Sequence, residues 1–262
     1  MDTDVIIVGG GPAGLTAALY LGRARKRVVV VDAGAPRHAV SEGVHNFLSR
    51  DGMAPAALRE VSWEQMAAYP SVAHRVGTVV ALEHEGGGWR AELAGGHALR
   101  ARAVLLATGM IDEHPAIDGF AERWARSIHQ CPYCHGWELR DRPLAALASG
   151  DSAAHYARML RGWSDDVVLL TNGGELPAEA RAELDAASMD VREAPLKALR
   201  GPGTELTHIE LEDGTTLARR GLFVMSAQRQ APLIASLELE TDEGGYVVTD
   251  GMGQTSRPML WA

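Results

Sequence analysis

The only two cysteines of the chain, Cys131 and Cys134, lie two residues apart in the run C-P-Y-C-H over residues 131–135. A C-x-x-C pair can interconvert between a dithiol and a small disulfide ring, or it can supply half of a metal site. A zinc site needs two more ligands, and the flanking His129 and His135 do not have the usual C-x-x-C…H-x-x-x-H spacing. The residue types therefore favour redox chemistry over zinc binding, with inert buried thiols as the other alternative.

The composition limits the classes of protein to which the chain can belong. With 262 residues, 46% of them apolar and 23% charged, the chain can bury the core of one large domain or of two without structural disulfides. A net charge of -9 argues against a nucleic-acid partner. The N-terminus lacks the pattern of a secretory signal, and no run of about 18 apolar residues could span a membrane. We therefore expect a cytoplasmic protein with no membrane partner, where a C-x-x-C pair is usually catalytic.

A glycine-rich turn follows the first apolar segment. Residues 5–8 (V-I-I-V) are typical of a parallel strand buried on both faces, and they lead into a G-x-G-x-x-G motif. In this motif Gly9 permits a tight turn, Gly11 lets the backbone approach a pyrophosphate, and Gly14 lets a helix pack closely on the sheet. We predict that a dinucleotide phosphate binds at the start of the helix that follows.

The next segments complete the unit that such a turn requires. A helical pattern over residues 15–21 precedes a second apolar strand over 28–31, which ends at Asp32, an acceptor for ribose hydroxyl groups. Another buried strand begins at residue 103 and ends in a Thr-Gly turn, and short antiparallel strands are expected between 79 and 102. The predicted cofactor-binding residues are Gly9, Gly11, Pro12, Ala13, Gly14, Asp32, Ala33, Thr108 and Gly109.

The order of these motifs resembles that of the low-molecular-weight thioredoxin-reductase-like flavoproteins. The resemblance covers nearly the whole chain, and its last motif is T-S-R-P at residues 255–258. It implies an α/β fold with two Rossmann-like, three-layer dinucleotide-binding domains, the second inserted in the first. The FAD-binding domain would comprise residues 1–114 and 245–262, and an NAD(P)-binding-like insert carrying the cysteines would comprise 115–244. Relatives are homodimers and continue beyond the position of Ala262, so the C-terminal part of the FAD domain is expected to be incomplete.

The resemblance also assigns roles to the cysteines. It implies that Cys134 reacts with the flavin and that Cys131 exchanges with the substrate. Relatives commonly have Asp after the second cysteine, where this chain has His135, and we expect this histidine to act as the acid/base. A surface histidine that caps a helix is the alternative. A place in the substrate site for residues 45–48 and Trp63 is a further hypothesis, with ordinary packing as its alternative.

The insert departs from the family pattern where a nicotinamide cofactor would bind. Only Gly150 remains of a glycine cluster, Ala148 and Ser149 add side chains, and Asp151 places a carboxylate near the incoming pyrophosphate. The turn at residues 171–174 contains no arginine for the 2′-phosphate of NADPH. The sequence therefore leaves the use of NAD(P)H open.

These observations predict an FAD-dependent disulfide oxidoreductase of the thioredoxin-reductase-like kind. The preferred hypothesis is oxidation of a dithiol, with electrons passing through Cys131 and Cys134 to FAD and then to oxygen; a branch of the family with a C-P-x-C-H motif and weakened nicotinamide motifs works in this direction. The expected substrate is a small dithiol or a thioredoxin-like protein. One alternative is an NAD(P)H-dependent thioredoxin or disulfide reductase. A more remote alternative is a non-catalytic flavin- or zinc-binding module.

Overall fold

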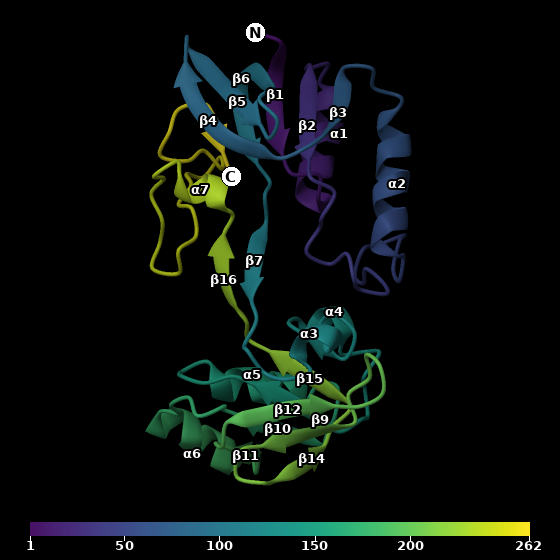
Figure 1. Ribbon diagram of the computed structural model, residues 1–262, viewed down its shortest axis with the longest axis vertical. Helices are drawn as coiled ribbons and strands as arrows, with labels where there is room; N and C mark the ends of the chain where they lie inside the picture. The colour runs from purple at the N-terminus through teal and green to yellow at the C-terminus, as the bar shows by residue number, and fades with distance from the viewer. The chain divides into compact units, whose positions relative to one another are not determined.

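The computed structural model describes all 262 residues, and the chain divides into two compact units. Unit 1 comprises Met1–Ala39, Ala56–Asp112 and Gln228–Ala262, and unit 2 comprises Val40–Pro55 and Glu113–Ala227. Two of the points where the chain passes between the units lie in β7 (Met110–Glu113) and β16 (Ala227–Gln230), which pair with each other (Figure 1). The predicted insertion of one α/β unit into another is therefore present.

Unit 1 is built on a seven-stranded sheet with the order β3-β2-β1-β6-β5-β4, in which β17 also pairs with β6. The strands are β1 (Thr3–Val8), β2 (Val28–Asp32), β3 (Val72–Val76), β4 (Val79–Glu85), β5 (Gly88–Leu93), β6 (Ala98–Leu106) and β17 (Leu260–Trp261). Strands β1, β2, β3, β6 and β17 are parallel, whereas β4 and β5 form an antiparallel pair. This pair confirms the antiparallel strands predicted between residues 79 and 102.

Alternating residues of β1 and β2 face two separate apolar layers, as the two-residue period of a strand requires. On one face, Ile7 and Val30 pack with Leu15 from α1 (Pro12–Arg23) and Met66 from α2 (Pro55–Met66). On the other face, Ile6 and Val8 pack against β4, β5 and α7 (Pro232–Ala235). The apolar run that opens the chain is buried on both faces, and it fixes the strand before the glycine turn.

Unit 2 contains a five-stranded parallel sheet with the order β11-β10-β9-β15-β8. Its strands are β8 (Ile128–His129), β9 (Leu144–Leu147), β10 (Val167–Leu170), β11 (Asp190–Arg192) and β15 (Gly221–Val224). One face is covered by α5 (Ala153–Leu160) and α6 (Ala178–Ala186), and the other by the antiparallel sheet of β12 (Leu196–Arg200), β13 (His208–Leu211) and β14 (Thr216–Ala218). Unit 2 is thus a second three-layer α/β unit, as predicted. It also contains the short helices α3 (Phe120–Arg123) and α4 (Pro132–His135).

The division of the chain departs from the expected domain boundaries in two places. Residues 228–244 pack with unit 1 rather than with the insert, because Leu233, Ile234 and Leu237 join the apolar cluster against β1 and β4. Residues 40–55, expected in the FAD-binding domain, group with unit 2, which carries the cysteines. The second difference bears directly on the redox site.

None of the helices in the structure is long and apolar enough to cross a membrane.

Candidate redox and dinucleotide sites

The glycine turn after β1 has the close backbone approaches that its sequence predicts. Gly9 has a φ of +111°, and a Cβ added there would lie 2.2 Å from the carbonyl oxygen of Ala107. A Cβ on Gly14 would lie 2.0 Å from the carbonyl oxygen of Gly9, so only glycine lets α1 approach the turn. A Cβ on Gly11 would meet no atom within 4 Å, which leaves the space beside its backbone open to a ligand. This cradle fits the pyrophosphate of a dinucleotide.

The remaining predicted cofactor-binding residues lie around this cradle. Pro12 and Ala13 are exposed in the first turn of α1, and Ala33 is exposed directly after β2. The contact between Gly9 and Ala107 brings the segment with Thr108 and Gly109 to the same edge of the sheet. The structure therefore gathers these residues at one edge, and their role in binding a cofactor stays a prediction.

Asp32, at the end of β2, is buried and pairs with the guanidinium group of Arg59 from α2. Arg59 also donates to the carbonyl oxygen of Gly34 at 3.3 Å, whereas its buried Nε has no hydrogen-bond partner. A Cβ on Gly10 would lie 2.6 Å from Cγ of Asp32, so the carboxylate lies directly behind the glycine turn. Arg59 thus holds the predicted ribose-binding carboxylate in place, a contact that nothing in the local sequence indicated.

Replacing Arg59 with alanine is expected to lower the free energy of unfolding by about 1–3 kcal/mol. The reason is that a largely buried carboxylate would lose its charged hydrogen-bond donor. Chemical denaturation of the apoprotein measures this change. Arg90→Ala, which removes ion pairs with the more exposed Glu83 and Glu92, serves as the control and should have a smaller effect. Equal losses in the two variants would contradict a structural role for the buried pair.

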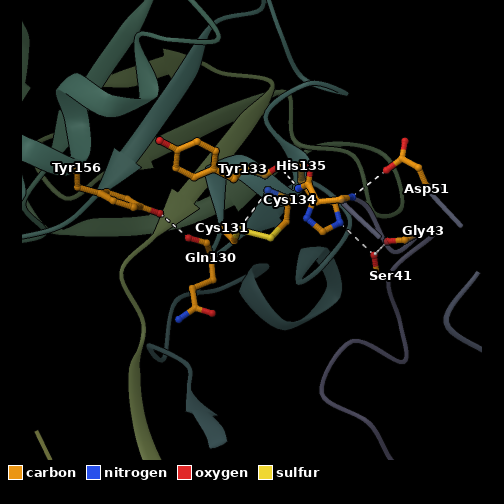
Figure 2. Close-up of a disulfide and its surroundings, with 10 residues drawn as sticks. Ser41, Gly43, Asp51, Gln130, Cys131, Tyr133, Cys134, His135 and Tyr156 are labelled. Atoms are coloured by element: carbon orange, nitrogen blue, oxygen red, sulfur yellow. Dashed lines mark hydrogen bonds between the residues drawn. A yellow bond between two sulfur atoms is a disulfide. The ribbon is translucent and has the colours of Figure 1, made fainter. Parts of the chain in front are cut away.

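In unit 2, Cys131 and Cys134 are joined by a disulfide, with their Cα atoms 5.2 Å apart (Figure 2). Cys131 is the N-cap of α4, and its Sγ accepts a hydrogen bond from the backbone N–H of Cys134 at 3.1 Å. A donor at this place stabilises negative charge on the sulfur of Cys131 when the disulfide is open. Throughout the chain, no group of three or more His, Cys, Asp or Glu side chains is arranged to hold a metal ion.

The segment of residues 40–55 lies against α4, which we call the disulfide helix because Cys131 caps it and Cys134 lies within it. The side-chain amide of Asn46 donates to the carbonyl oxygen of Tyr133 at 2.7 Å, and Nε2 of His45 lies 3.6 Å from a carboxylate oxygen of Glu138. Arg126 pairs with Glu42 at 3.0 Å. These contacts explain why this part of the sequence groups with unit 2 rather than with the sheet of unit 1.

The structure gives different answers for the two parts of the hypothesis that residues 45–48 and Trp63 line the substrate site. His45 and Asn46 contact the region of the disulfide, and Leu48 is 93% exposed. Trp63 instead is partly buried against the apolar cluster of α1 and stacks on His74, with 4.1 Å between the ring centroids. Ordinary packing therefore accounts for Trp63, whereas the position of residues 45–48 is compatible with contact to a substrate.

Two histidine rings stack beside the disulfide. The rings of His129 and His135 have centroids 4.2 Å apart and planes 14° apart. Nε2 of His129 donates to the carbonyl oxygen of Arg126 at 3.0 Å, and its buried Nδ1 has no partner. Burial and the neighbouring His135 lower the pKa of His129 to about 3. Burial and the nearby His45 also lower the pKa of His135, against the opposing effect of Glu138, so both rings are neutral at neutral pH.

The neutral His129 makes stability depend on pH. The unfolded chain binds a proton at this residue near pH 6.5, which the folded chain does not bind until about pH 3. The stabilisation is therefore complete above pH 6.5 and is lost as the pH falls toward 3. We expect the free energy of unfolding to fall less steeply with acidification in His129→Gln, in which the side-chain amide can still donate to Arg126. The exposed His155→Gln is the control, and equal slopes for both variants and the parent chain would contradict this account.

A cleft of about 420 Å³ in unit 2 lies at the carboxyl ends of β9, β10 and β15, where doubly wound sheets bind nucleotides. Its lining residues include no lysine or arginine. Ser149 fills the space beside Gly174, where an added Cβ would meet the Cβ of Ser149 at 2.5 Å. The exposed Asp151 comes just before α5. The cleft therefore offers no guanidinium or ammonium group to the phosphates of NADPH and fits that cofactor poorly.

The sequence-based reasoning missed Arg59, Ser41 and the stacking of His129 on His135. Nε2 of His135 lies 3.1 Å from Oγ of Ser41, a residue 94 positions away in the sequence (Figure 2). The two histidines flanking the cysteines were visible as possible ligands, but their spacing gave no sign that the rings stack. No local pattern distinguishes Ser41 or Arg59 from other polar residues.

The chain resembles known proteins over nearly its whole length. Among curated proteins, "Thioredoxin reductase aclD" of Aspergillus oryzae is 31% identical over 280 residues, which cover 99% of this chain and 87% of that protein. "Thioredoxin reductase tcpT" of Claviceps purpurea is 34% identical over 180 residues, which cover 66% of this chain and 56% of that protein.

Two solved structures share the fold closely. The structure described as "Crystal structure of HlmI" is 42% identical with a TM-score of 0.92, and the match covers 99% of this chain and 83% of that one. The putative thioredoxin reductase TrxB from Bacillus anthracis is 34% identical, also with a TM-score of 0.92, and the match covers 98% of this chain and 88% of that one. The expected α/β fold is thereby confirmed.

One protein family accounts for both α/β units and for the C-x-x-C disulfide. Residues 3–262 match the family described as pyridine nucleotide-disulphide oxidoreductase. The similarity to thioredoxin reductases, which are enzymes, agrees with this match. The chain belongs to the pyridine nucleotide-disulphide oxidoreductase family and is thioredoxin-reductase-like.

Proposed function

We propose that this protein is an FAD-dependent oxidase that converts a dithiol to a disulfide, with oxygen as the final electron acceptor. The observation that carries the direction is the cleft of unit 2, which is lined by no lysine or arginine that could bind the phosphates of a nicotinamide cofactor. The glycine cradle of unit 1, by contrast, fits a dinucleotide. Electrons would therefore enter through the Cys131–Cys134 disulfide rather than through NAD(P)H.

The Cys131–Cys134 disulfide accepts two electrons from the substrate. One substrate thiolate attacks Sγ of Cys131, the disulfide bond breaks, and Cys134 leaves as a thiolate. The second substrate thiolate then attacks the first substrate sulfur and releases Cys131. The products are a substrate disulfide and the reduced cysteine pair. The N–H of Cys134, 3.1 Å from Sγ of Cys131, stabilises the thiolate that leaves in the second step.

His135 is proposed as the base that accepts a proton from a thiol and returns it to a departing thiolate. Its ring lies between the disulfide and Ser41 in Figure 2. Because its pKa is lowered by burial and by His45, the ring is neutral and able to accept a proton at neutral pH. When bound at the glycine cradle, FAD would take two electrons from the cysteine pair and pass them to oxygen, giving hydrogen peroxide.

The substrate is proposed to be a small dithiol or a thioredoxin-like protein. Tyr133 and Trp137 on either side of the Cys134-His135 pair are 67% and 65% exposed, and Leu48 of the neighbouring segment is also exposed. Such exposed side chains, on and just after α4 and on the segment of residues 40–55, offer apolar contact area to a substrate. We further propose that the protein is cytoplasmic and a homodimer. Sedimentation of the FAD-loaded protein tests the dimer.

Anaerobic stopped-flow mixing of the FAD-loaded protein with dithiothreitol, NADH and NADPH tests the direction of the reaction. We expect rapid loss of flavin absorbance with dithiothreitol, recovery on admission of air, and little change with either nicotinamide. Rapid bleaching by NADH or NADPH would overturn the proposal. It would favour the second candidate, an NAD(P)H-dependent disulfide reductase. This candidate agrees with the names of the fungal relatives, both of which are called thioredoxin reductases.

A further inference from the structure

Ser41 connects the segment of residues 40–55 to the histidine beside the disulfide. The side chain is buried, and its hydroxyl donates a hydrogen bond to the carbonyl oxygen of Gly43 at 2.9 Å. A serine hydroxyl has one hydrogen, and a carbonyl oxygen can only accept. The single proton of Ser41 is therefore committed to Gly43, and its oxygen can only accept from the ring of His135, whose Nε2 lies 3.1 Å away.

This arrangement determines which nitrogen of His135 carries the proton. Nε2 must be an N–H to donate to Ser41, so in the neutral ring Nδ1 carries the lone pair. Nδ1 of His135 forms no hydrogen bond with the protein. It is also not fully buried, in contrast to Nδ1 of His129. The nitrogen that can accept a proton is thus also the one left accessible.

We propose that Ser41 is a positioning residue that fixes the tautomer and the ring orientation of His135, so that Nδ1 serves as the base in thiol–disulfide exchange. The assignment of a base rests on the proposed function, whereas the tautomer rests on the hydrogen bonds alone. Ser41 itself contacts neither sulfur in any hydrogen bond and acts only through the ring.

The groups around His135 leave this role to Ser41. His129 stacks on the ring at 4.2 Å but donates its own Nε2–H to Arg126 and offers no hydrogen bond to His135. His45 meets the ring edge-on, with centroids 5.8 Å apart, and is itself placed between Asp51 and Glu138.

The protonation of the His135 ring depends on its surroundings: Glu138 favours the protonated ring, while burial and His45 oppose it. Only Ser41 forms a hydrogen bond with a ring nitrogen of His135.

Nuclear magnetic resonance of the FAD-loaded protein with isotope-labelled histidine tests the tautomer directly. In the parent chain we expect His135 to be a single Nε2–H tautomer at neutral pH. In Ser41→Ala the signal should broaden or become a mixture, and Ser41→Thr, which keeps the hydroxyl, should restore it. Ser127→Ala is the matched control, because it removes another buried hydroxyl that donates to a carbonyl oxygen, that of Thr204, at 2.7 Å. An Nδ1–H tautomer in the parent chain would overturn the proposal.

The pH profile of flavin bleaching by dithiothreitol, from about pH 5 to pH 9, tests the catalytic consequence. In Ser41→Ala we expect the plateau rate to fall about fivefold, since one hydrogen bond that orients the base is lost. The pH of half-maximal rate should move down, because the protonated ring loses a stronger hydrogen bond than the neutral ring does. Ser127→Ala should move neither quantity, and an unchanged profile in Ser41→Ala would overturn the proposed role.

The magnetic resonance and bleaching experiments together distinguish a failure of this inference from a failure of the proposed function. If no variant is bleached by dithiothreitol but the tautomer depends on Ser41, the oxidase proposal fails and the tautomer assignment stands. If bleaching proceeds in every variant and the tautomer does not respond to Ser41, the positioning role fails and the oxidase proposal stands.

Discussion

Replacing Cys134 with serine is expected to abolish reduction of bound flavin by dithiols, with a rate at least about a thousandfold below that of the parent chain. The variant cannot form the Cys131–Cys134 disulfide and so has no redox pair that can take two electrons from the substrate and pass them to the flavin. The flavin content should not change, because the glycine cradle is formed within unit 1 and the cysteines belong to unit 2. Anaerobic stopped-flow absorbance with dithiothreitol measures the effect. Rapid bleaching of the Cys134→Ser protein would contradict the assignment of the redox pair.

Cys131→Ser is the matched control and also tests which sulfur exchanges with the substrate. Each single variant keeps one thiol, which can be titrated with an aromatic disulfide reagent that releases one coloured thiolate for each mixed disulfide formed. Cys131 in the Cys134→Ser protein should react about tenfold faster than Cys134 in the Cys131→Ser protein, because only Cys131 accepts an N–H hydrogen bond at the N-cap of α4. Faster reaction of Cys134 would reverse the two roles.

Replacing Gly11 with alanine is expected to weaken FAD binding about tenfold or more while leaving the apoprotein folded. Gly11 has a φ of -77° and a ψ of -178°, which alanine adopts without strain, and the added Cβ would meet no protein atom within 4 Å. The methyl group would instead occupy the space through which a pyrophosphate approaches the backbone. Titration of the apoprotein with FAD measures affinity, and thermal melting of the apoprotein should change by no more than about 2 °C.

Gly14→Ala provides the contrast within the same motif. Its Cβ would lie 2.0 Å from the carbonyl oxygen of Gly9, so α1 or the turn must move and the apoprotein itself should be destabilised. Gly11→Ala therefore tests the approach of the cofactor to the cradle, whereas Gly14→Ala tests the packing of α1 that supports the cradle. If Gly11→Ala binds FAD as tightly as the parent chain, the dinucleotide does not approach this turn.

Much of the fold could be predicted because its signals are local. The apolar run before Gly9 is buried on both faces, and the required order of strand, turn and helix is contiguous in the sequence. The helix and the second strand appear as α1 and as β2 ending at Asp32, and the antiparallel pair appears as β4 and β5. The boundary at residue 228 differs from the expected one at 245, because the apolar residues between these positions join unit 1 only through packing in the folded chain.

The α/β class, the glycine cradle and the Cys131–Cys134 pair could be predicted from the sequence, because each depends on residues that are neighbours in the chain. The polar groups that contact these features could be identified only in the folded chain. Arg59 reaches Asp32 from another helix, and Ser41 reaches His135 across 94 positions. Such contacts have no spacing rule, since they depend on how distant segments pack. The tautomer of His135 follows from a hydrogen bond that exists only when residues 40–55 lie against the disulfide helix.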